Sequence, residues 1–168
     1  MTAPTTPSAT TGKGIDPRGP RFTAGVVAIL FLVVIALALV GLTDPTAAAA
    51  ALGLAIFNAV VFLWAAIRGV QHHPYGLFFK KVIRPRLKPP VELEDPIPPT
   101  FAQGVGLFVT VLGIVFFFVA GPIALVVAGA AAFVATFLNS VFAYCLGCQI
   151  YLLLARAGVV GRKRPAAA

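Results

Sequence analysis

Long apolar segments dominate the chain, and short polar or basic segments separate them. Four apolar segments are long enough for spanning helices, because about 20 apolar residues cross a hydrocarbon core of about 30 Å. They cover residues 22–42, 47–67, 104–120 and a run that begins near Ile123. The pattern predicts an all-α membrane protein with four transmembrane helices, whose principal partner is the lipid bilayer.

The breaks between these segments predict how the helices are connected. Thr43-Asp44-Pro45-Thr46 and Gly121-Pro122 are short turns, since Gly and Pro favour chain reversal. We therefore expect two tandem helical hairpins, over residues 21–67 and 101–157. The last apolar run continues to Ala155 and would be about 50 Å long as one straight helix. It either tilts as a whole or bends near Gly147 and finishes along the membrane interface.

Composition supports lipid as the solvent and gives an orientation. The 168 residues are 60% hydrophobic and only 11% charged, whereas a soluble domain carries about a quarter charged residues. All thirteen Lys and Arg lie in the two tails or the linker over residues 68–100, and the tight turns contain none. The positive-inside rule then places both termini and the linker in the cytoplasm. We attribute the net charge of +8 to orientation and expect no nucleic acid partner.

The segments outside the hairpins have their own compositions. Residues 1–20 are rich in Thr, Ala, Pro and Gly and are predicted to be a disordered tail. Residues 68–100 form a basic, proline-rich linker, and residues 158–168 form a basic C-terminal tail. Within the linker, Lys80, Lys81 and Arg84 alternate with apolar pairs. This pattern suits either an amphipathic segment on anionic lipid or a plain solvated loop.

The chain also repeats part of its own sequence. Asp16-Pro17, Pro20, Phe22 and Gly25-Val26 recur 79 residues later as Asp95-Pro96, Pro99, Phe101 and Gly104-Val105. An Asn-x-Val at Asn58 recurs at Asn139. The repeat suggests a duplicated hairpin. Because amides are costly in lipid unless they are paired, we expect both asparagines inside the bundle, either in interhelical hydrogen bonds or, less favoured, at a solute site.

The best candidate for chemistry is the pair Cys145-x-x-Cys148 near the end of the last apolar run. Residues three apart on a helix share a face, and this spacing suits a disulfide, dithiol exchange or two ligands of a metal. The alternative is that both thiols are small packing residues. His72 and His73 would complete four metal ligands, but Pro74 follows them, so a solvated loop is the favoured interpretation. We expect no bound metal or cofactor.

Several motifs together resemble a bacterial integral membrane family catalogued as domain of unknown function 4395. They are Asp16-x-Arg18, His73-Pro74-Tyr75, Glu94-Asp95-Pro96-x-Pro98-Pro99-x-Phe101-Ala102-Gln103 and Cys145-x-Gly147-Cys148-x-x-Tyr151. Thr100 departs from the family pattern, which has arginine there, while Arg21 holds the equivalent place in the first repeat. The resemblance implies a bacterial plasma (inner) membrane protein in which the cysteine pair is a signature feature.

These observations support one hypothesis and two rivals. The first is a membrane dithiol protein in which Cys145 and Cys148 exchange reducing equivalents or sulfane sulfur with a thioredoxin-like or sulfurtransferase partner. The second is a transport or channel-like module for a small solute, using Asn58 and Asn139 and forming a homo-oligomer. The third is a structural subunit of a membrane complex. The sequence contains no conventional catalytic constellation, and the apolar spans carry no charged residue, which disfavours a pump.

Overall fold

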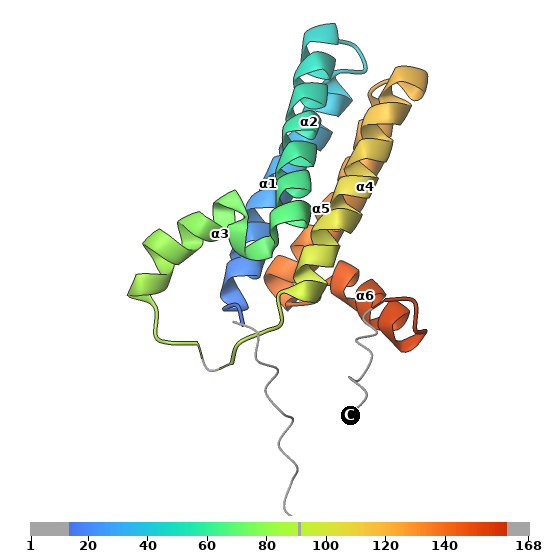
Figure 1. The fold of residues 1–168 in the computed structure, drawn as a ribbon. Coiled ribbons are helices and arrows are strands. Elements are labelled where there is room, and N and C mark those ends of the chain that lie inside the picture. Colours follow the sequence, from blue (N-terminus) through green and yellow to red (C-terminus); the bar gives the residue numbers. More distant parts are fainter. Residues whose placement is uncertain (1–13, 91, 161–168) are drawn as a thin grey trace, which may run out of the picture.

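The computed structural model describes residues 14–90 and 92–160 and shows a bundle of four long helices (Figure 1). The four helices are α1 (Arg18–Val40), α2 (Pro45–Arg68), α4 (Ile97–Ala120) and α5 (Ile123–Phe142). Each is long and apolar enough to cross a membrane. This confirms the all-α membrane fold with four candidate spanning helices.

Both hairpins turn at the same end of the bundle (Figure 1). Gly41 ends α1 so close to α2 that an added Cβ would lie 2.7 Å from the Cα of Ala48. Asp44 then caps α2, because its carboxylate accepts a hydrogen bond of 2.8 Å from the backbone N–H of Thr46. The other turn uses Gly121 at φ +70°, a conformation that side chains disfavour.

Each helix of the first hairpin packs mainly against one helix of the second. α1 lies mainly against α5, and α2 lies mainly against α4. The buried core between them consists of Val27, Phe31, Val34, Ala38, Ala51, Ala55, Phe62, Leu125 and Ala132. The outward faces stay apolar as well; Val119, for example, is 84% exposed. A soluble protein rarely exposes so much apolar surface, whereas lipid accepts it.

The linker is more helical than its prolines suggest. It contains the 3-10 turn η1 (Val70–His72), the short helix α3 (Pro74–Phe78), a π-helical turn η2 (Phe79–Ile83) and a second 3-10 turn η3 (Arg84–Arg86). Phe79 is buried, while Lys80 and Lys81 are exposed beside the exposed Phe78 and Val82. The segment is therefore helical, and its contact with anionic lipid stays a prediction. Together these turns run across the bundle axis at the end opposite the hairpin turns (Figure 1).

Helix α4 begins earlier than the sequence predicts. The apolar segment starts at Gly104, but the helix starts at Ile97 and includes Pro98 and Pro99 in its first turn. Proline is accepted there because the first N–H groups of a helix have no partner within the helix. The carboxylate of Asp95 accepts a hydrogen bond of 2.9 Å from the N–H of Ile97 and so fixes the helix start.

The last apolar run is bent, which decides between the two alternatives for it. α5 ends at Phe142, Ala143 takes a left-handed conformation at φ 57°, and α6 (Leu146–Arg156) follows. The break therefore lies at residues 143–145, just before the glycine at which we expected it. Figure 1 shows α6 lying across the end of the bundle, at the same end as α3 but on its opposite side.

One contact joins two positions that the sequence repeat makes equivalent, and one pair of equivalent positions makes similar contacts in the two halves. Ile15 and Glu94, which are 79 residues apart, form a symmetric bridge with two backbone hydrogen bonds of 2.9 Å. The rings of the equivalent residues Phe22 and Phe101 each lie tilted against another ring, Phe22 against Phe79 and Phe101 against Tyr151, with ring centroids 5.6 Å apart in both pairs. A duplicated hairpin with two-fold related halves would produce such matched contacts, and the duplication itself stays a prediction.

Candidate functional site

The cysteine pair lies at the beginning of α6. Cys145 is the residue before the first turn, with an extended backbone, and Cys148 is in that turn. A disulfide joins them, with their Cα atoms 5.2 Å apart. The Sγ of Cys145 also accepts a hydrogen bond of 3.2 Å from the backbone N–H of Cys148. The pair is therefore at the N-terminal end of a helix, where N–H groups and the helix dipole favour a thiolate.

Local packing holds α6 in this position. Gly147 lies directly on α4, and a Cβ added there would come within 2.6 Å of the Cβ of Ala102. The ring of Tyr151 packs one turn later against Phe101. The left-handed Ala143 turns the chain away from α5, and the N–H of Tyr144 donates a 3.2 Å hydrogen bond back to Leu138. The first two turns of α6, which carry the cysteines, are thus held against α4 by Gly147 and Tyr151.

One side of the disulfide borders a groove that carries charge. This outer groove has a volume of about 290 Å³ and lies between the beginning of α1, the segment before α4 and the beginning of α6. Arg21, Glu94, Asp95 and Gln149 contribute its exposed polar side chains, and Cys145 and Cys148 both line it. The groove is at the end of the bundle that carries the basic residues, so a water-soluble protein on that side would meet the disulfide there.

The other side of Cys145 borders a space inside the bundle. This inner cavity has a volume of about 220 Å³ and extends between α1, α4, α5 and α6. Its lining contains no charged side chain, and its polar side chains are Thr23, Gln103, Thr136, Asn139 and Cys145. The side-chain oxygen of Gln103 is buried there without a hydrogen-bond partner among the described residues. Cys145 and Asn139 line both the inner cavity and the outer groove.

The described helices, the cysteine pair and both spaces fall within a region that matches a family model. The model is described as Domain of unknown function (DUF4395), and it matches residues 15–156. The chain belongs to this family. The match confirms the family that the sequence motifs indicate. No curated protein and no solved structure matches the chain, so the comparisons assign no activity to this DUF4395 protein.

The two asparagines of the repeat are in different environments. Asn58 is 2% exposed, and its amide donates a hydrogen bond of 2.9 Å to the carbonyl of Leu54 in its own helix. That bond is intrahelical, whereas we expected an interhelical one, because the backbone carbonyl one turn earlier is within reach of the side chain. Asn139 is partly exposed and lines both spaces near the disulfide. Only Asn139 is therefore near the cysteine pair.

The basic segment is divided between two roles. Lys80 and Lys81 are exposed, as a lipid-facing cation would be. Arg84 instead lies 3.7 Å from the buried carboxylate of Asp16, which also binds Arg18 at 2.8 Å. The hydrogen bond from Arg18 lowers the pKa of Asp16, although burial opposes this shift. Arg84 thus ties the linker to the beginning of α1.

The two adjacent histidines do not share an environment. His72 is exposed, and its Nδ1 lies 2.7 Å from the carbonyl of Arg68. His73 is completely buried at the N-terminus of α3, and neither of its ring nitrogens has a partner among the described residues. Burial lowers the pKa of His73 from 6.5 to about 4. The solvated loop that we expected is therefore wrong for His73, and the described residues contain no His, Cys, Asp and Glu group able to hold a metal.

Two further residues make contacts that the sequence did not predict. Thr100, the position that departs from the family pattern, accepts a hydrogen bond of 3.1 Å from the N–H of Val70 and donates one of 2.7 Å to Pro96. It therefore links the linker to α4. Gln103 stands in a run of apolar and small residues. This single amide in an apolar helix was a feature of the sequence that could have pointed to a polar site inside the bundle.

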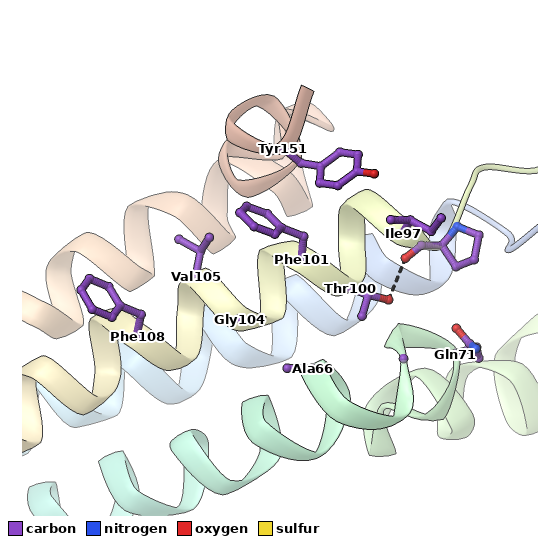
Figure 2. Close-up of a pocket in the computed structure, with 11 residues that line it drawn as sticks. Ala66, Gln71, Ile97, Thr100, Phe101, Gly104, Val105, Phe108 and Tyr151 are labelled. Atoms are coloured by element: carbon purple, nitrogen blue, oxygen red, sulfur yellow. Dashed lines mark hydrogen bonds between the residues drawn. The ribbon is translucent and has the colours of Figure 1, made fainter. Parts of the chain in front are cut away.

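A third space lies on the outside of the bundle and is largely apolar. This lateral groove has a volume of about 660 Å³ and is bordered by the end of α2, the beginning of α4 and Tyr151 of α6. Figure 2 shows the rings of Phe101 and Tyr151 on one side of it and Ala66 of α2 on the other. Val105 lines both this groove and the inner cavity. The lateral groove offers no group for chemistry, so the candidate site is the disulfide together with the outer groove and the inner cavity.

Proposed function

We propose that this DUF4395 protein is a membrane-embedded dithiol protein that exchanges reducing equivalents with a soluble protein dithiol. The observation that carries the proposal is the position of the pair: Cys145 and Cys148 are joined at a helix N-terminus, in the wall of an open groove. Buried packing cysteines have no need of either feature. A stabilised thiolate and access are the two properties that thiol exchange requires.

The proposed reaction uses both sulfurs in turn. A thiolate of the partner attacks the Sγ of Cys145, the Cys145–Cys148 bond breaks, and Cys148 leaves as the thiolate. The second partner thiolate then attacks the mixed disulfide and releases Cys145, whose negative charge the N–H of Cys148 stabilises at 3.2 Å. The partner loses two electrons and two protons and becomes a disulfide, while the membrane protein becomes a dithiol. A thioredoxin-like domain is the partner class that this exchange suits; a sulfurtransferase that passes on sulfane sulfur is the alternative.

We further propose that the protein resides in a bacterial plasma membrane with both termini in the cytoplasm. All basic residues of the described spans and linker lie at the end of the bundle that carries α3 and α6 (Figure 1). The positive-inside rule assigns that end to the cytoplasm, where thioredoxin-like proteins are reducing. The exposed Lys80 and Lys81 would then meet anionic lipid of the inner leaflet.

Cysteine accessibility in oriented vesicles tests the proposal. A membrane-impermeant maleimide should label Cys145 and Cys148 from the cytoplasmic side, and only after reduction. A variant with Cys145→Ser and Cys148→Ser is the blank, and Thr43→Cys in that background marks the opposite side, since Thr43 lies in the turn between α1 and α2. Thiols that stay unlabelled from both sides with and without reductant would show packing residues and would end the proposal.

The partner can be captured through the remaining sulfur. Cys148→Ser leaves Cys145 as a lone thiol, which can attack the disulfide of an oxidised partner and form a mixed disulfide that Cys148 can no longer resolve. Acid quenching before the partner's second thiol reverses this step should trap a covalent adduct, which should disappear on reduction. Cys145→Ser is the matched control and should trap much less adduct. Its remaining thiol, Cys148, is not at the N-cap of α6 and so lacks the backbone N–H that stabilises the thiolate of Cys145. Equal trapping by both variants would contradict the assignment of Cys145 as the exchanging sulfur.

A second candidate function is transport of a small solute, and the inner cavity with Asn139 in its wall is what favours it. Uptake that survives loss of both cysteines and disappears with Asn139→Leu would support transport. Asn58 does not line the cavity and is already bonded within its own helix. The site therefore supports this function less well than dithiol exchange.

A further inference from the structure

The disulfide is bordered by two spaces of different chemistry. The outer groove carries both signs of charge, and the inner cavity carries none. Cys145 lines both, so one sulfur is within reach of a ligand on either side. A dithiol protein that takes electrons from one substrate must pass them to another, and the second space is the place where a different substrate would bind.

We propose, on the basis of the function proposed above, that the inner cavity binds the head group of a membrane quinone, which reoxidises the cysteine pair. A quinone head group is neutral and largely apolar, with two carbonyl oxygens. The cavity matches each of these properties: it has no charge, mostly apolar walls, and a volume of about 220 Å³ that suits one or two fused six-membered rings. A charged small molecule would instead be penalised there, because nothing in the lining would pair with it.

The two carboxamides explain why both redox states of such a ligand would be accommodated. An amide side chain both donates and accepts hydrogen bonds. The amide N–H groups of Gln103 and Asn139 can donate to quinone carbonyls. The side-chain oxygen of Gln103 is buried without a partner among the described residues, and a rotation of this amide toward the cavity that it lines would let the oxygen accept from a quinol hydroxyl. A buried acceptor without a partner is unfavourable, and a ligand hydroxyl would remove that penalty.

The position of the cavity also gives a lipid-soluble ligand a way in. Ala131 lies in the middle of the candidate spanning helix α5, is exposed on the outside of the bundle, and lines the cavity. Ile150 of α6 lines it as well and is 41% exposed. The cavity therefore reaches the surface that lipid would cover, whereas the outer groove lies between the beginning of α1, the segment before α4 and the beginning of α6. A quinone and a soluble protein would not compete for the same entrance.

The redox step is balanced without any further reactant. The thiolate of Cys145 adds to the quinone, Cys148 attacks that sulfur, and the disulfide forms as the ring leaves with two electrons. Two protons, released from the two thiols, complete the quinol. The dithiol is oxidised to the disulfide and the quinone is reduced to the quinol, in a ratio of one to one.

The test uses the full-length protein in detergent, reduced with dithiothreitol and then freed of it by gel filtration. Decylubiquinone is the probe, because its ring carbons are all substituted and it does not form stable thiol adducts. Loss of one quinone and two free thiols per chain is expected. Gln103→Leu should raise the Kd about tenfold, as expected for one lost hydrogen bond in a buried site. Gln71→Leu is the matched control, since Gln71 is exposed and does not line the inner cavity.

Binding is measured separately from electron transfer, so that the two proposals can fail independently. Equilibrium dialysis of radiolabelled decylubiquinone against the variant with Cys145→Ser and Cys148→Ser reports binding in the cavity alone. If Gln103→Leu does not fold, Ala135→Leu replaces it as the test variant. Its larger side chain fills the cavity and should abolish saturable binding. Exchange with a soluble dithiol but no saturable quinone binding would overturn the quinone proposal and leave the proposed function standing. A pair that reacts with neither would overturn both.

Discussion

The tight contact between α6 and α4 yields a prediction that can be worked from distances. An alanine Cβ at Gly147 would lie 2.6 Å from the Cβ and 2.7 Å from the Cα of Ala102. Carbon atoms in contact are ordinarily about 3.5–4.0 Å apart. The obstacle includes a helix backbone, so a side-chain rotation cannot relieve it. Gly147→Ala must therefore displace the beginning of α6 from α4 by about 1 Å.

The expected cost is that of overpacking, about 1–3 kcal/mol, and it falls on the helix that carries the cysteines. Gly104→Ala is the matched control, because nothing lies within 4 Å of a Cβ added at Gly104 on α4. In a helix interior that substitution should stabilise by up to about 1 kcal/mol. The two glycine substitutions are thus predicted to have opposite signs.

Thermal unfolding in detergent measures the stability of both variants, and the labelling rate of the reduced cysteines reports on α6. We expect a lower midpoint and faster labelling for Gly147→Ala, with an unchanged labelling rate and an unchanged or higher midpoint for Gly104→Ala. Equal midpoints and equal labelling rates in the two variants would show that α6 does not rest on α4 as described.

Three further predictions concern residues away from the disulfide. Burial lowers the pKa of His73 to about 4, so the imidazole is protonated below pH 6.5 in the unfolded chain but only below about pH 4 in the folded protein. The free energy of unfolding should therefore fall as the pH falls from 6.5 to about 4. At about 1.4 kcal/mol per pH unit, the decrease should be roughly 3 kcal/mol. His73→Phe should lose that slope, which denaturant titrations at several pH values would show. Asp16→Asn removes the charged acceptor of Arg18 and should lower the free energy of unfolding by about 2 kcal/mol; an unchanged midpoint at pH 7 would contradict it. Thr100→Val leaves the N–H of the 4% exposed Val70 without its acceptor and should cost about 1–3 kcal/mol, with faster amide exchange at Val70 as the specific sign.

The spanning helices could be predicted because their signal is local. Each is an apolar run of the required length, and the turns at Thr43-Asp44-Pro45-Thr46 and Gly121-Pro122 stand out between them. The beginning of α4 could not be placed in this way. Ile97 belongs to a proline-rich stretch that hydropathy assigns to the linker, whereas helix starts tolerate proline.

The site depends on contacts that the sequence does not display. The break before Cys145 occurs at Ala143, an alanine in a left-handed conformation, and alanine gives no hint of such a turn. The burial of His73 likewise depends on what packs over it, while the neighbouring Pro74 suggests a loop. The cysteine spacing predicted that the two thiols could be joined, and it could not predict that a charged groove and a neutral cavity lie on either side of Cys145.

The central claim is that Cys145 and Cys148 form a reversible redox pair, and a redox titration in native membranes tests it most directly. Membranes would be equilibrated with a series of ratios of reduced to oxidised dithiothreitol and then quenched with acid. The free thiols would be alkylated before mass spectrometry of the peptide that contains both cysteines. The account predicts a reversible two-electron transition with the same midpoint from the oxidised and the reduced side. A pair that stays fully oxidised or fully reduced across the series would contradict it.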